Sequence, residues 1–360
     1  MPRTQHTLQT TPIALAAPSS YTTDWGQALC GDSLKLLENL PDESINLVMT
    51  SPPFALQRKK EYGNRDQHEY VDWLSDFAEL VLKKLKPDGS FVLDLGGAYR
   101  KGVPARSLYN FRIPIHFCDN LGFYLAEDFY WFNPSKLPSP IEWVNKRKIR
   151  AKDAVNTVWW FSKSEFPKAN VTNVLTEYSA RMKKLLEDPD KFYDPMKRPS
   201  GHDIGKGFGK DNKGAIPSNL LQIPNSESNG AYMSGCKAIS AKRHPARFPA
   251  KLPEFFIRFL TDPGDLVVDI FSGSNTTGYV AEKEQREWLS FDSEIEYVAA
   301  SAFRFLDKNT PTDTLRDVYE SIKKGDSINI SDYRSQMRLF REDSAAYDVP
   351  ISNADGITRR

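Results

Sequence analysis

The stretch DLVVDIFSGSNTTG, residues 265–278, decides the fold of this chain. It begins with an apolar run typical of a buried strand, passes through a turn at Gly273, and continues into the start of a helix. Glycine at such a turn lets the backbone approach a ligand closely. Asn275 stands where a second glycine would complete a Gly-x-Gly pattern, and asparagine tolerates left-handed backbone geometry better than most residues. The stretch therefore predicts a strand–turn–helix unit with a ligand at its turn.

This turn suits an anionic group, and the strand that follows suits a ribose. The N–H groups at the helix N-terminus would belong to Ser274, Asn275, Thr276 and Thr277. Asp292 ends the next expected strand, 19 residues after Gly273, and a carboxylate there can accept both ribose hydroxyls. The ligand could be S-adenosylmethionine or a dinucleotide, and an ordinary turn without a ligand is the alternative. A dinucleotide usually demands Gly-x-Gly-x-x-Gly, whose absence disfavours a Rossmann oxidoreductase.

The same alternation of strand and helix recurs along the chain. Further apolar runs that end in small or polar residues lie at 27–33, 45–51, 89–97, 126–135, 155–163 and 287–294. Helical patterns occupy 70–85 and 252–260. The pattern predicts an α/β fold with about seven strands in a mostly parallel sheet and helices on both faces. Ligands bind such sheets beyond the carboxyl ends of the strands, which is where the polar motifs of this chain occur.

The alternation also suggests where the chain divides. Residues 162–240 are rich in Gly, Pro and polar residues and are too long for a simple connection. Around them we expect a catalytic half at 21–161 and a cofactor-binding half at 241–308. Residues 1–20 are expected to be a disordered tail, because their apolar patch is short for a signal peptide. DKNTPTDTL, residues 307–315, is typical of the end of a core, so 309–360 are interpreted as a C-terminal extension.

The motif TSPPF, residues 50–54, has the residue types that methyl transfer to an exocyclic amine requires. Pro52 and Pro53 fix the backbone and hold Ser51 extended at a strand end. The Ser51 hydroxyl and the Pro52 carbonyl can accept hydrogen bonds from an amine, and Phe54 offers a ring on which a base can stack. Asp94, at the end of GSFVLD, can bond Ser51 and polarise it. Taken alone, these residues could instead form a rigid strand-exit turn without chemistry.

Composition and charge limit the partners. The net charge is only +1, yet residues 131–251 hold 22 Lys and Arg against 11 Asp and Glu. A basic middle in a neutral protein points to a polyanion, with a solvated charged surface as the alternative. Cys30, Cys118 and Cys236 form no CxxC pair, so we expect neither a disulfide framework nor a metal site. No apolar run is long enough to span a bilayer, and we expect a cytoplasmic protein.

TSPPF and DIFSGSNTTG, in that reversed order, resemble the motifs of the β-class amino-methyltransferases of DNA. Within that class the chain is similar to the PvuII-type cytosine-N4 modification methyltransferases. The similarity covers residues 21–308 and is carried by TSPPFALQRKKEYGN, FNPSKLPSPIEWVNKRKIR, RPSGHDIGK and HPARFPAKLPEFFIRFL. It implies a Rossmann-like methyltransferase fold, S-adenosyl-L-methionine as cofactor, and methylation of cytosine N4 in double-stranded DNA. It also implies a bacterial or phage-encoded restriction-modification system.

The resemblance also assigns residues to the two ends of one site. It supports Ser51, Pro52, Pro53, Phe54 and Asp94 as the catalytic residues. The cofactor contacts that it implies are Asp32, Pro245, Ala246, Asp269, Phe271, Gly273, Ser274, Asn275, Thr276, Thr277 and Asp292.

DNA contacts are expected in two segments. The leading phosphate contacts are Lys146, Arg147, Lys148, Arg150 and Lys152, followed by Lys163. Base contacts are expected in residues 162–240, the target-recognition region, from Arg198, His202, Asp203, Lys206, Lys210 and Asn212. The resemblance of RPSGHDIGK and NLLQIPNSESN to the PvuII type implies the target CAGCTG, methylated at its inner cytosine. We expect a monomer, since each DNA strand can be modified in a separate encounter.

The sequence also bears on the alternatives to cytosine-N4 methylation. Adenine-N6 enzymes of this type usually carry Asp-Pro-Pro-Tyr, so Ser-Pro-Pro-Phe favours cytosine N4. Cytosine-C5 methylation needs a cysteine nucleophile, usually after a proline, and none of the three cysteines follows one. RNA stays open as a substrate class. A non-catalytic DNA-binding relative is opposed by the presence of Ser51, Asp94, Gly273 and Asp292.

Overall fold

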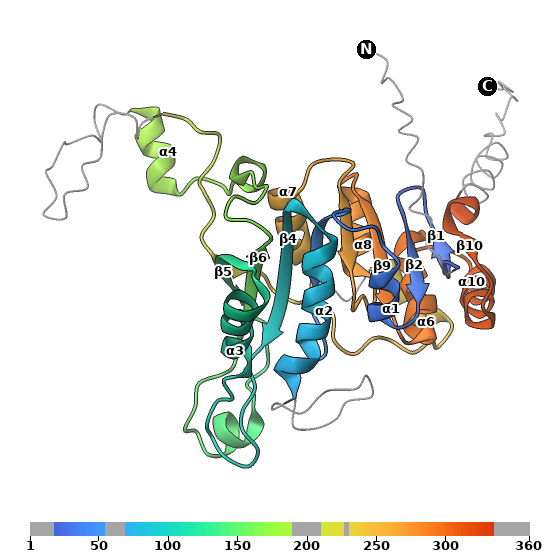
Figure 1. Ribbon diagram of the computed structural model, residues 1–360, viewed down its shortest axis with the longest axis horizontal. Coiled ribbons are helices and arrows are strands. Elements are labelled where there is room, and N and C mark those ends of the chain that lie inside the picture. The colour runs from blue at the N-terminus through green and yellow to red at the C-terminus, as the bar shows by residue number, and fades with distance from the viewer. Residues whose placement is uncertain (1–17, 55–68, 189–209, 227–229, 335–360) are drawn as a thin grey trace, which may run out of the picture.

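A computed structural model describes residues 18–54, 69–188, 210–226 and 230–334 (Figure 1). Its strands form one sheet in the order β10-β1-β2-β9-β8-β3-β4-β6-β5-β7. The strands are β1 (Tyr21–Thr22), β2 (Gly26–Cys30), β3 (Ile45–Thr50), β4 (Leu85–Gly96), β5 (Tyr124–Phe132), β6 (Val155–Ser162), β7 (Leu220–Gln222), β8 (Leu266–Asp269), β9 (Glu287–Asp292) and β10 (Ile328–Asn329).

Helices connect most of these strands. The α-helices are α1 (Ser33–Glu38), α2 (Tyr70–Lys84), α3 (Tyr109–His116), α4 (Ala180–Glu187), α6 (Ala231–Ala238), α7 (Lys251–Leu260), α8 (Thr276–Lys283), α9 (Ile295–Ser301) and α10 (Thr312–Lys324). Short π or 3-10 segments are η1 (Phe117–Leu121), η2 (Glu142–Lys146), η3 (Val171–Val174) and η5 (Ala302–Phe305). No helix in these described ranges is both long and apolar enough to cross a membrane.

The sequence prediction of a mostly parallel sheet is confirmed. All seven expected strands are present, as β2, β3, β4, β5, β6, β8 and β9. Five of them, β2, β9, β8, β3 and β4, pair in parallel, while β6 runs antiparallel between β4 and β5. Because the parallel strands all end at the same edge, the residues that follow them meet there.

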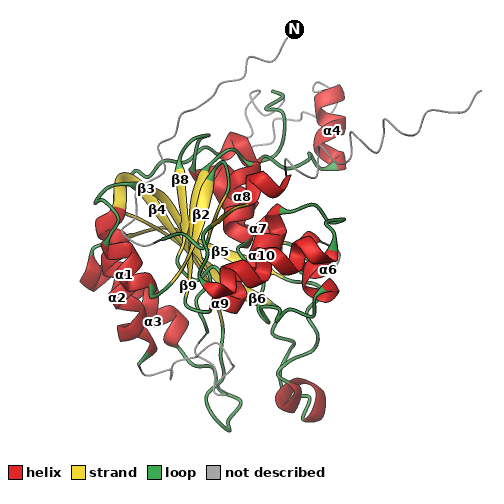
Figure 2. Cartoon of the chain, turned by 90° about the vertical axis from the view of Figure 1, so that its right-hand side faces the viewer, coloured by secondary structure: helices red, strands yellow, loops and turns green. Residues whose placement is uncertain are grey.

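Helices cover both faces of the sheet, as Figure 2 shows with α1, α2 and α3 on one side and α6 to α10 on the other. Each face has its own core of buried apolar side chains. In β3, Leu47 and Met49 pack toward the second group of helices, and Val48 packs toward the first. A strand buried on both faces reads as a continuous apolar run, which is why 45–50 gave such a clear strand signal.

The extent of the core differs from the sequence expectation at two points. The core does not end near Leu306, because α10 buries Leu315, Val318 and Ile322 against it, and β10 pairs with β1. These apolar residues lie on one side of an otherwise polar helix, so the segment looks charged overall. Residues 162–240 are not wholly outside the sheet either, since β7 pairs with β5. A strand of three residues is too short to give an alternation signal.

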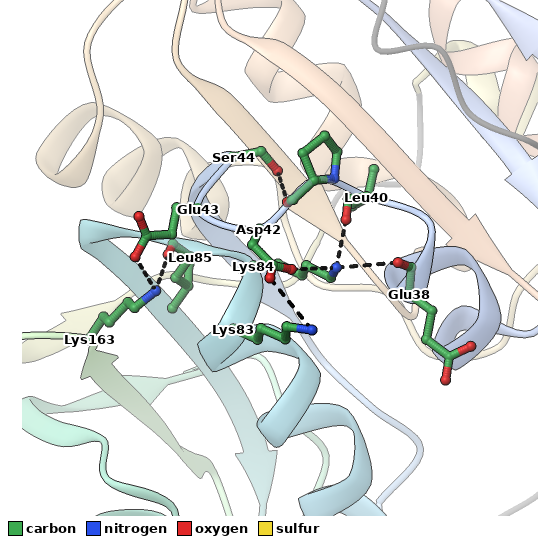
Figure 3. Close-up of polar contacts among 10 residues, drawn as sticks. Glu38, Leu40, Asp42, Glu43, Ser44, Lys83, Lys84, Leu85 and Lys163 are labelled. Carbon is green, nitrogen blue, oxygen red and sulfur yellow. Dashed lines mark hydrogen bonds and ion pairs between the residues drawn. The ribbon is translucent and has the colours of Figure 1, made fainter.

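A buried lysine joins two connections at the amino edge of the sheet (Figure 3). The side chain of Lys84, at the end of α2, is only 5% exposed. Its ammonium donates to the carbonyl oxygens of Glu38 at 3.2 Å and Leu40 at 2.6 Å, and to Asp42 Oδ1 at 2.8 Å. The bonds tie the loop between α1 and β3 to the junction of α2 and β4. A buried charge with three acceptors is expected to be structural rather than catalytic.

We predict that Lys84→Met lowers the free energy of unfolding by about 2–4 kcal/mol, because it leaves buried acceptors without a donor. Lys83→Ala is the matched control: its ammonium lies 3.5 Å from the same Asp42 carboxylate, but its side chain is 62% exposed. Exposed pairs contribute little, so this variant should unfold like the parent. Urea denaturation of both variants measures the difference, and equal midpoints would contradict the proposed role of Lys84.

Candidate active site

A cavity of about 880 Å³ opens at the carboxyl edge of the sheet. Residues that follow β2, β3, β5, β8 and β9 line it, together with Asp94 near the end of β4 and Asn156 near the start of β6. All five expected catalytic residues, Ser51, Pro52, Pro53, Phe54 and Asp94, are among them. The expected cofactor residues that line it are Asp32, Pro245, Ala246, Phe271, Gly273, Ser274, Thr276 and Asp292. The fold therefore brings both motifs to one cavity.

Ser51 and Asp94 form a hydrogen-bonded pair at one end of the cavity. Ser51 Oγ donates to Asp94 Oδ2 at 3.0 Å, and Asn156 Nδ2 donates to Asp94 Oδ1 at 3.1 Å. Burial raises the pKa of the Asp94 carboxyl to about 6, while the bonds from Asn156 and Ser51 act in the opposite direction. Because the Ser51 proton is directed to Asp94, the lone pairs of its oxygen are left to accept from a group in the cavity.

Phe54 lies against a glycine of the neighbouring strand. A Cβ atom at Gly96 would be only 2.4 Å from the Phe54 ring, so any larger residue there would displace the ring. Gly96 also accepts a hydrogen bond from the hydroxyl of Tyr109 in α3. The position of the aromatic ring beside Ser51 thus depends on a glycine in β4.

Asn275 adopts the left-handed conformation that its place in the turn predicted, with φ 52° and ψ 48°. Its side chain is completely buried. Oδ1 accepts from the Gly278 N–H at 3.0 Å and from Ser290 Oγ at 2.6 Å, and Nδ2 donates to the Tyr21 hydroxyl at 2.9 Å. Asparagine therefore supplies both the backbone geometry of glycine and the cap of α8.

Asp269 holds the same turn in place through the hydrogen bonds of its buried side chain. It is 1% exposed and accepts Thr50 Oγ1 and Thr277 Oγ1, each at 2.7 Å, and the Phe271 N–H at 3.1 Å. Burial raises the pKa of its carboxyl to about 6. Asp269, Asn275 and Thr277 do not line the cavity, so their side chains hold the turn rather than reach a ligand.

Two carboxylates lie at neighbouring strand ends on the opposite side of the cavity. Asp292 Oδ2 accepts the Gly273 N–H at 2.8 Å, and burial raises the pKa of the Asp292 carboxyl. Cys30, in β2, pairs with Asp292 in the sheet, so Asp32 follows close by, where it caps α1. Gly273 itself has φ 51°, and a Cβ there would be 3.0 Å from the His244 ring.

An aromatic wall completes this end of the cavity, and the sequence did not reveal it. The Phe271 ring centre lies 4.9 Å from that of Phe77 and 5.6 Å from that of Trp73, both in α2. All three rings line the cavity. On sequence alone, Trp73 and Phe77 belong to the apolar side of a helix, and only packing shows that part of this side faces a cavity.

Four polar residues that line the cavity were also missed by the sequence analysis. Lys136 and Asn133 follow β5, Asn156 starts β6, and Asn225 follows β7, and all four line the cavity. A polar residue at the start of a strand normally belongs to the other edge of a parallel sheet. Because β6 is antiparallel to β4, Asn156 instead lies at the carboxyl edge. The direction of a strand is not visible in its sequence.

The five residues expected to lead the phosphate contacts lie in the segment between β5 and β6, which Figure 1 shows in green beyond the arrowhead end of β4. All five are exposed. Lys146 and Arg147 pair with Glu142 at 3.4 and 3.0 Å, Arg150 donates to the Pro104 carbonyl, and Lys152 donates to the Pro134 carbonyl. Asn133 and Asn156, which flank the segment, line the cavity, so this basic segment begins and ends at the cavity wall.

Lys163 was wrongly grouped with them. It follows β6 and donates to Glu43 Oε1 at 3.1 Å and to the Leu85 carbonyl at 2.8 Å, at the edge where β3 and β4 begin (Figure 3). This is the edge opposite the cavity.

Only part of the expected base-reading set can be placed. Arg198, His202, Asp203 and Lys206 lie outside the described residues. Lys210 and Asn212 are exposed and do not line the cavity. The Asn212 N–H donates to the Tyr178 hydroxyl, which places it near α4.

Comparison with known proteins gives consistent results. Residues 45–303 match a family described as DNA methylase. The type II methyltransferase M.PvuII of Proteus hauseri is 71% identical over 87% of this chain and 93% of its own length. M.BglII of Bacillus subtilis is 25% identical over 84% of this chain and 76% of its own length. The solved structure of the PvuII DNA methyltransferase (cytosine-N4-specific) aligns with a TM-score of 0.74, at 60% identity, over 88% of this chain and 99% of that one.

We predict that Asn275→Ala lowers the free energy of unfolding by about 2–4 kcal/mol, because three buried bonds are lost and the left-handed backbone is strained. Asn275→Gly should lose roughly 1 kcal/mol less, since glycine accepts this conformation. Gln285→Gly is the control, because Gln285 is exposed and also left-handed, with φ 61°. It should leave stability unchanged or slightly higher. Urea denaturation that ranks Ala and Gly at position 275 equally would contradict the conformational part of this account.

Proposed function

The chain belongs to the family of DNA methylases, and we propose that it transfers a methyl group from S-adenosyl-L-methionine to N4 of cytosine in double-stranded DNA. One observation carries the proposal: the Ser51–Asp94 pair and the Gly273 turn line the same cavity. The cytosine-N4 specificity in the description of the aligned PvuII structure supports the choice of base and atom.

The residues at the turn fit the proposed donor. Asp292 and Asp32 offer acceptors for ribose hydroxyls, and the Phe271 wall offers an apolar surface for adenine. Gly273, without a side chain, lets a ligand approach the turn closely. When bound, S-adenosyl-L-methionine would supply a methyl group on a positively charged sulfur that keeps the bonding electrons. The roles of the protein are then to position the amine and to receive its proton.

The cytosine amine is a poor nucleophile because its lone pair is delocalised into the ring. Ser51 Oγ and the Pro52 carbonyl are fixed acceptors that would draw the two amine hydrogens out of the ring plane and localise the lone pair on nitrogen. Most of the acceleration then comes from positioning and electrostatics. As the new bond to carbon forms, the nitrogen becomes acidic and would release a proton to Ser51 Oγ, while Ser51 passes its own proton to the Asp94 carboxylate.

The target base must leave the duplex to reach this cavity, because its amine is paired with guanine inside the helix. Phe54, fixed against Gly96, would stack on the extruded cytosine. The basic segment between β5 and β6 would hold the flanking phosphates, and residues 162–240 would read the sequence, with CAGCTG as the proposed site. We further propose that the protein acts as a monomer in the bacterial cytoplasm and protects DNA from a matching endonuclease.

Plasmid from cells that express this protein should resist a CAGCTG-cutting endonuclease, and mass spectrometry should find N4-methylcytosine in that plasmid. Plasmid from cells that carry the empty vector is the control and should be cut. N4-methylcytosine in another sequence context would reject the target and keep the chemistry. N6-methyladenine, or no methylation by soluble protein, would reject the proposed reaction.

Chemistry and cofactor binding should be separable by mutation. We expect Ser51→Ala to lower the single-turnover rate about a hundredfold, typical of losing one transition-state contact, while cofactor affinity in calorimetry stays within about twofold. Asp292→Ala should instead weaken cofactor binding, because the ribose loses its acceptor and Gly273 loses a backbone bond. A Ser51→Ala variant that transfers methyl groups at the parent rate would remove Ser51 from the mechanism.

DNA affinity should depend on salt through the basic segment. The triple variant Lys146→Ala, Arg147→Ala, Lys148→Ala should lower the slope of log affinity against log salt by about three, one for each lost phosphate contact. Lys163→Ala removes a cation at the opposite edge and should leave the slope unchanged. Equal slopes for the triple variant and the parent would place the DNA face elsewhere.

A further inference from the structure

We propose that Asn156 is a positioning residue that keeps Asp94 ionised and aims one of its oxygens at Ser51. The inference rests on the proposed methyl transfer and adds to it a residue that acts through Asp94. No motif of the sequence pointed to Asn156, because it precedes an apolar run and reads as the first polar residue of a buried strand.

The antiparallel register between β4 and β6 creates the contact. Asn156 stands opposite Gly96, and Asp94 stands opposite Val158, so Asn156 and Asp94 are diagonal neighbours on one side of the sheet. The Asn156 amide donates to Asp94 Oδ1 at 3.1 Å, and both side chains are buried, with Asn156 9% and Asp94 2% exposed. Gly96, opposite Asn156, has no side chain, and the Phe54 ring occupies the space that a Cβ atom there would need.

The two oxygens of Asp94 have different partners, which makes the orientation specific. Oδ2 accepts from Ser51, and Oδ1 accepts from Asn156. An amide that can only donate at this contact favours the ionised carboxylate. If Asn156 were removed, Oδ1 would lose its donor in a buried site, and a protonated Asp94 would compete with Ser51 as a hydrogen donor.

Few other groups are placed to keep the Asp94 carboxylate ionised. Lys136, which follows β5, lines the same cavity and lowers the pKa of Asp94 by its charge, but among the described residues its ammonium makes no hydrogen bond to the carboxylate. Tyr70, at the start of α2, also interacts electrostatically with Asp94, and burial raises the pKa of its hydroxyl well above the ordinary tyrosine value. Its hydroxyl makes no hydrogen bond within the described residues. Asn156 is therefore the main donor to Asp94 besides Ser51.

The test is the single-turnover rate of methyl transfer between pH 5.5 and 9 for the full-length protein, with labelled S-adenosyl-L-methionine and a CAGCTG duplex. Loss of one hydrogen bond to a carboxylate raises its pKa by about one unit. The ionised form is the active one, so the acid limb of the profile should move to higher pH. For Asn156→Ala, the loss at pH 6 should exceed the loss at pH 9 by about fivefold.

Thr157→Val is the matched control. Thr157 is the next residue of β6, is equally buried at 9% exposure, and also donates to β4, through Oγ1 to the Leu95 carbonyl at 3.1 Å. Its loss removes a buried bond between the same two strands without touching Asp94, so the acid limb should stay in place. The thermal unfolding temperature and the cofactor affinity of both variants should be measured, to check that each variant is folded and binds cofactor under the assay conditions.

A second variant pair tests whether Asn156 acts through Asp94. In an Asp94→Asn background, the further change Asn156→Ala should alter the rate by less than about twofold and should not alter the pH profile. A loss in Asn156→Ala that is the same at every pH, or that persists undiminished in the Asp94→Asn background, would overturn the inference. Absence of methyl transfer by the parent protein would instead overturn the proposed function, so the two failures are distinguishable.

Discussion

The site depends on the hydrogen bonds that the buried carboxylate of Asp269 accepts. This carboxylate accepts a hydroxyl from Thr50, at the end of β3, and another from Thr277, in the first turn of α8. Thr50 and Asp269 are 219 residues apart, yet β3 and β8 are neighbours in the sheet. A carboxylate in this position would be costly if its oxygens were unpaired, and here three donors satisfy them. The catalytic motif and the cofactor turn are thus fixed to each other through one side chain.

Each motif contains residues that face the cavity and residues that hold them in place. In the turn, Gly273 and Ser274 line the cavity, whereas Asn275 and Thr277 point into the protein. At the other end, Ser51 and Asp94 line the cavity together with Asn156. The basic segment that we propose for phosphate contacts leads into β6, where Asn156 donates to Asp94. A site built on strand ends of one sheet keeps these groups at fixed distances, as positioning catalysis requires.

Much of this could be predicted from local sequence. The runs at 45–51 and 265–274 are apolar on both faces, and they were correctly assigned as buried parallel strands. The left-handed turn at Asn275 and the Ser51–Asp94 bond were also expected, because asparagine tolerates that geometry and both residues end a strand. The packing of α10 on the core, beyond Leu306, was not expected, because its apolar residues are spaced among charged ones. The position of Lys163 at the edge opposite the cavity was not expected either, because it depends on strand direction.

The sequence by itself determined the fold class, the two motifs and the residue types that carry the chemistry, because hydrophobic period, glycine and proline act over a few neighbouring residues. Only the tertiary structure decided which of those residues meet. The pairing of β3 with β8, the antiparallel direction of β6 and the packing of α2 are contacts between distant segments. They place Asn156 beside Asp94 and Trp73 beside Phe271, and no local pattern encodes such neighbours. Their physical origin is the burial of two apolar faces of one sheet, which fixes strand order only when the whole chain has folded.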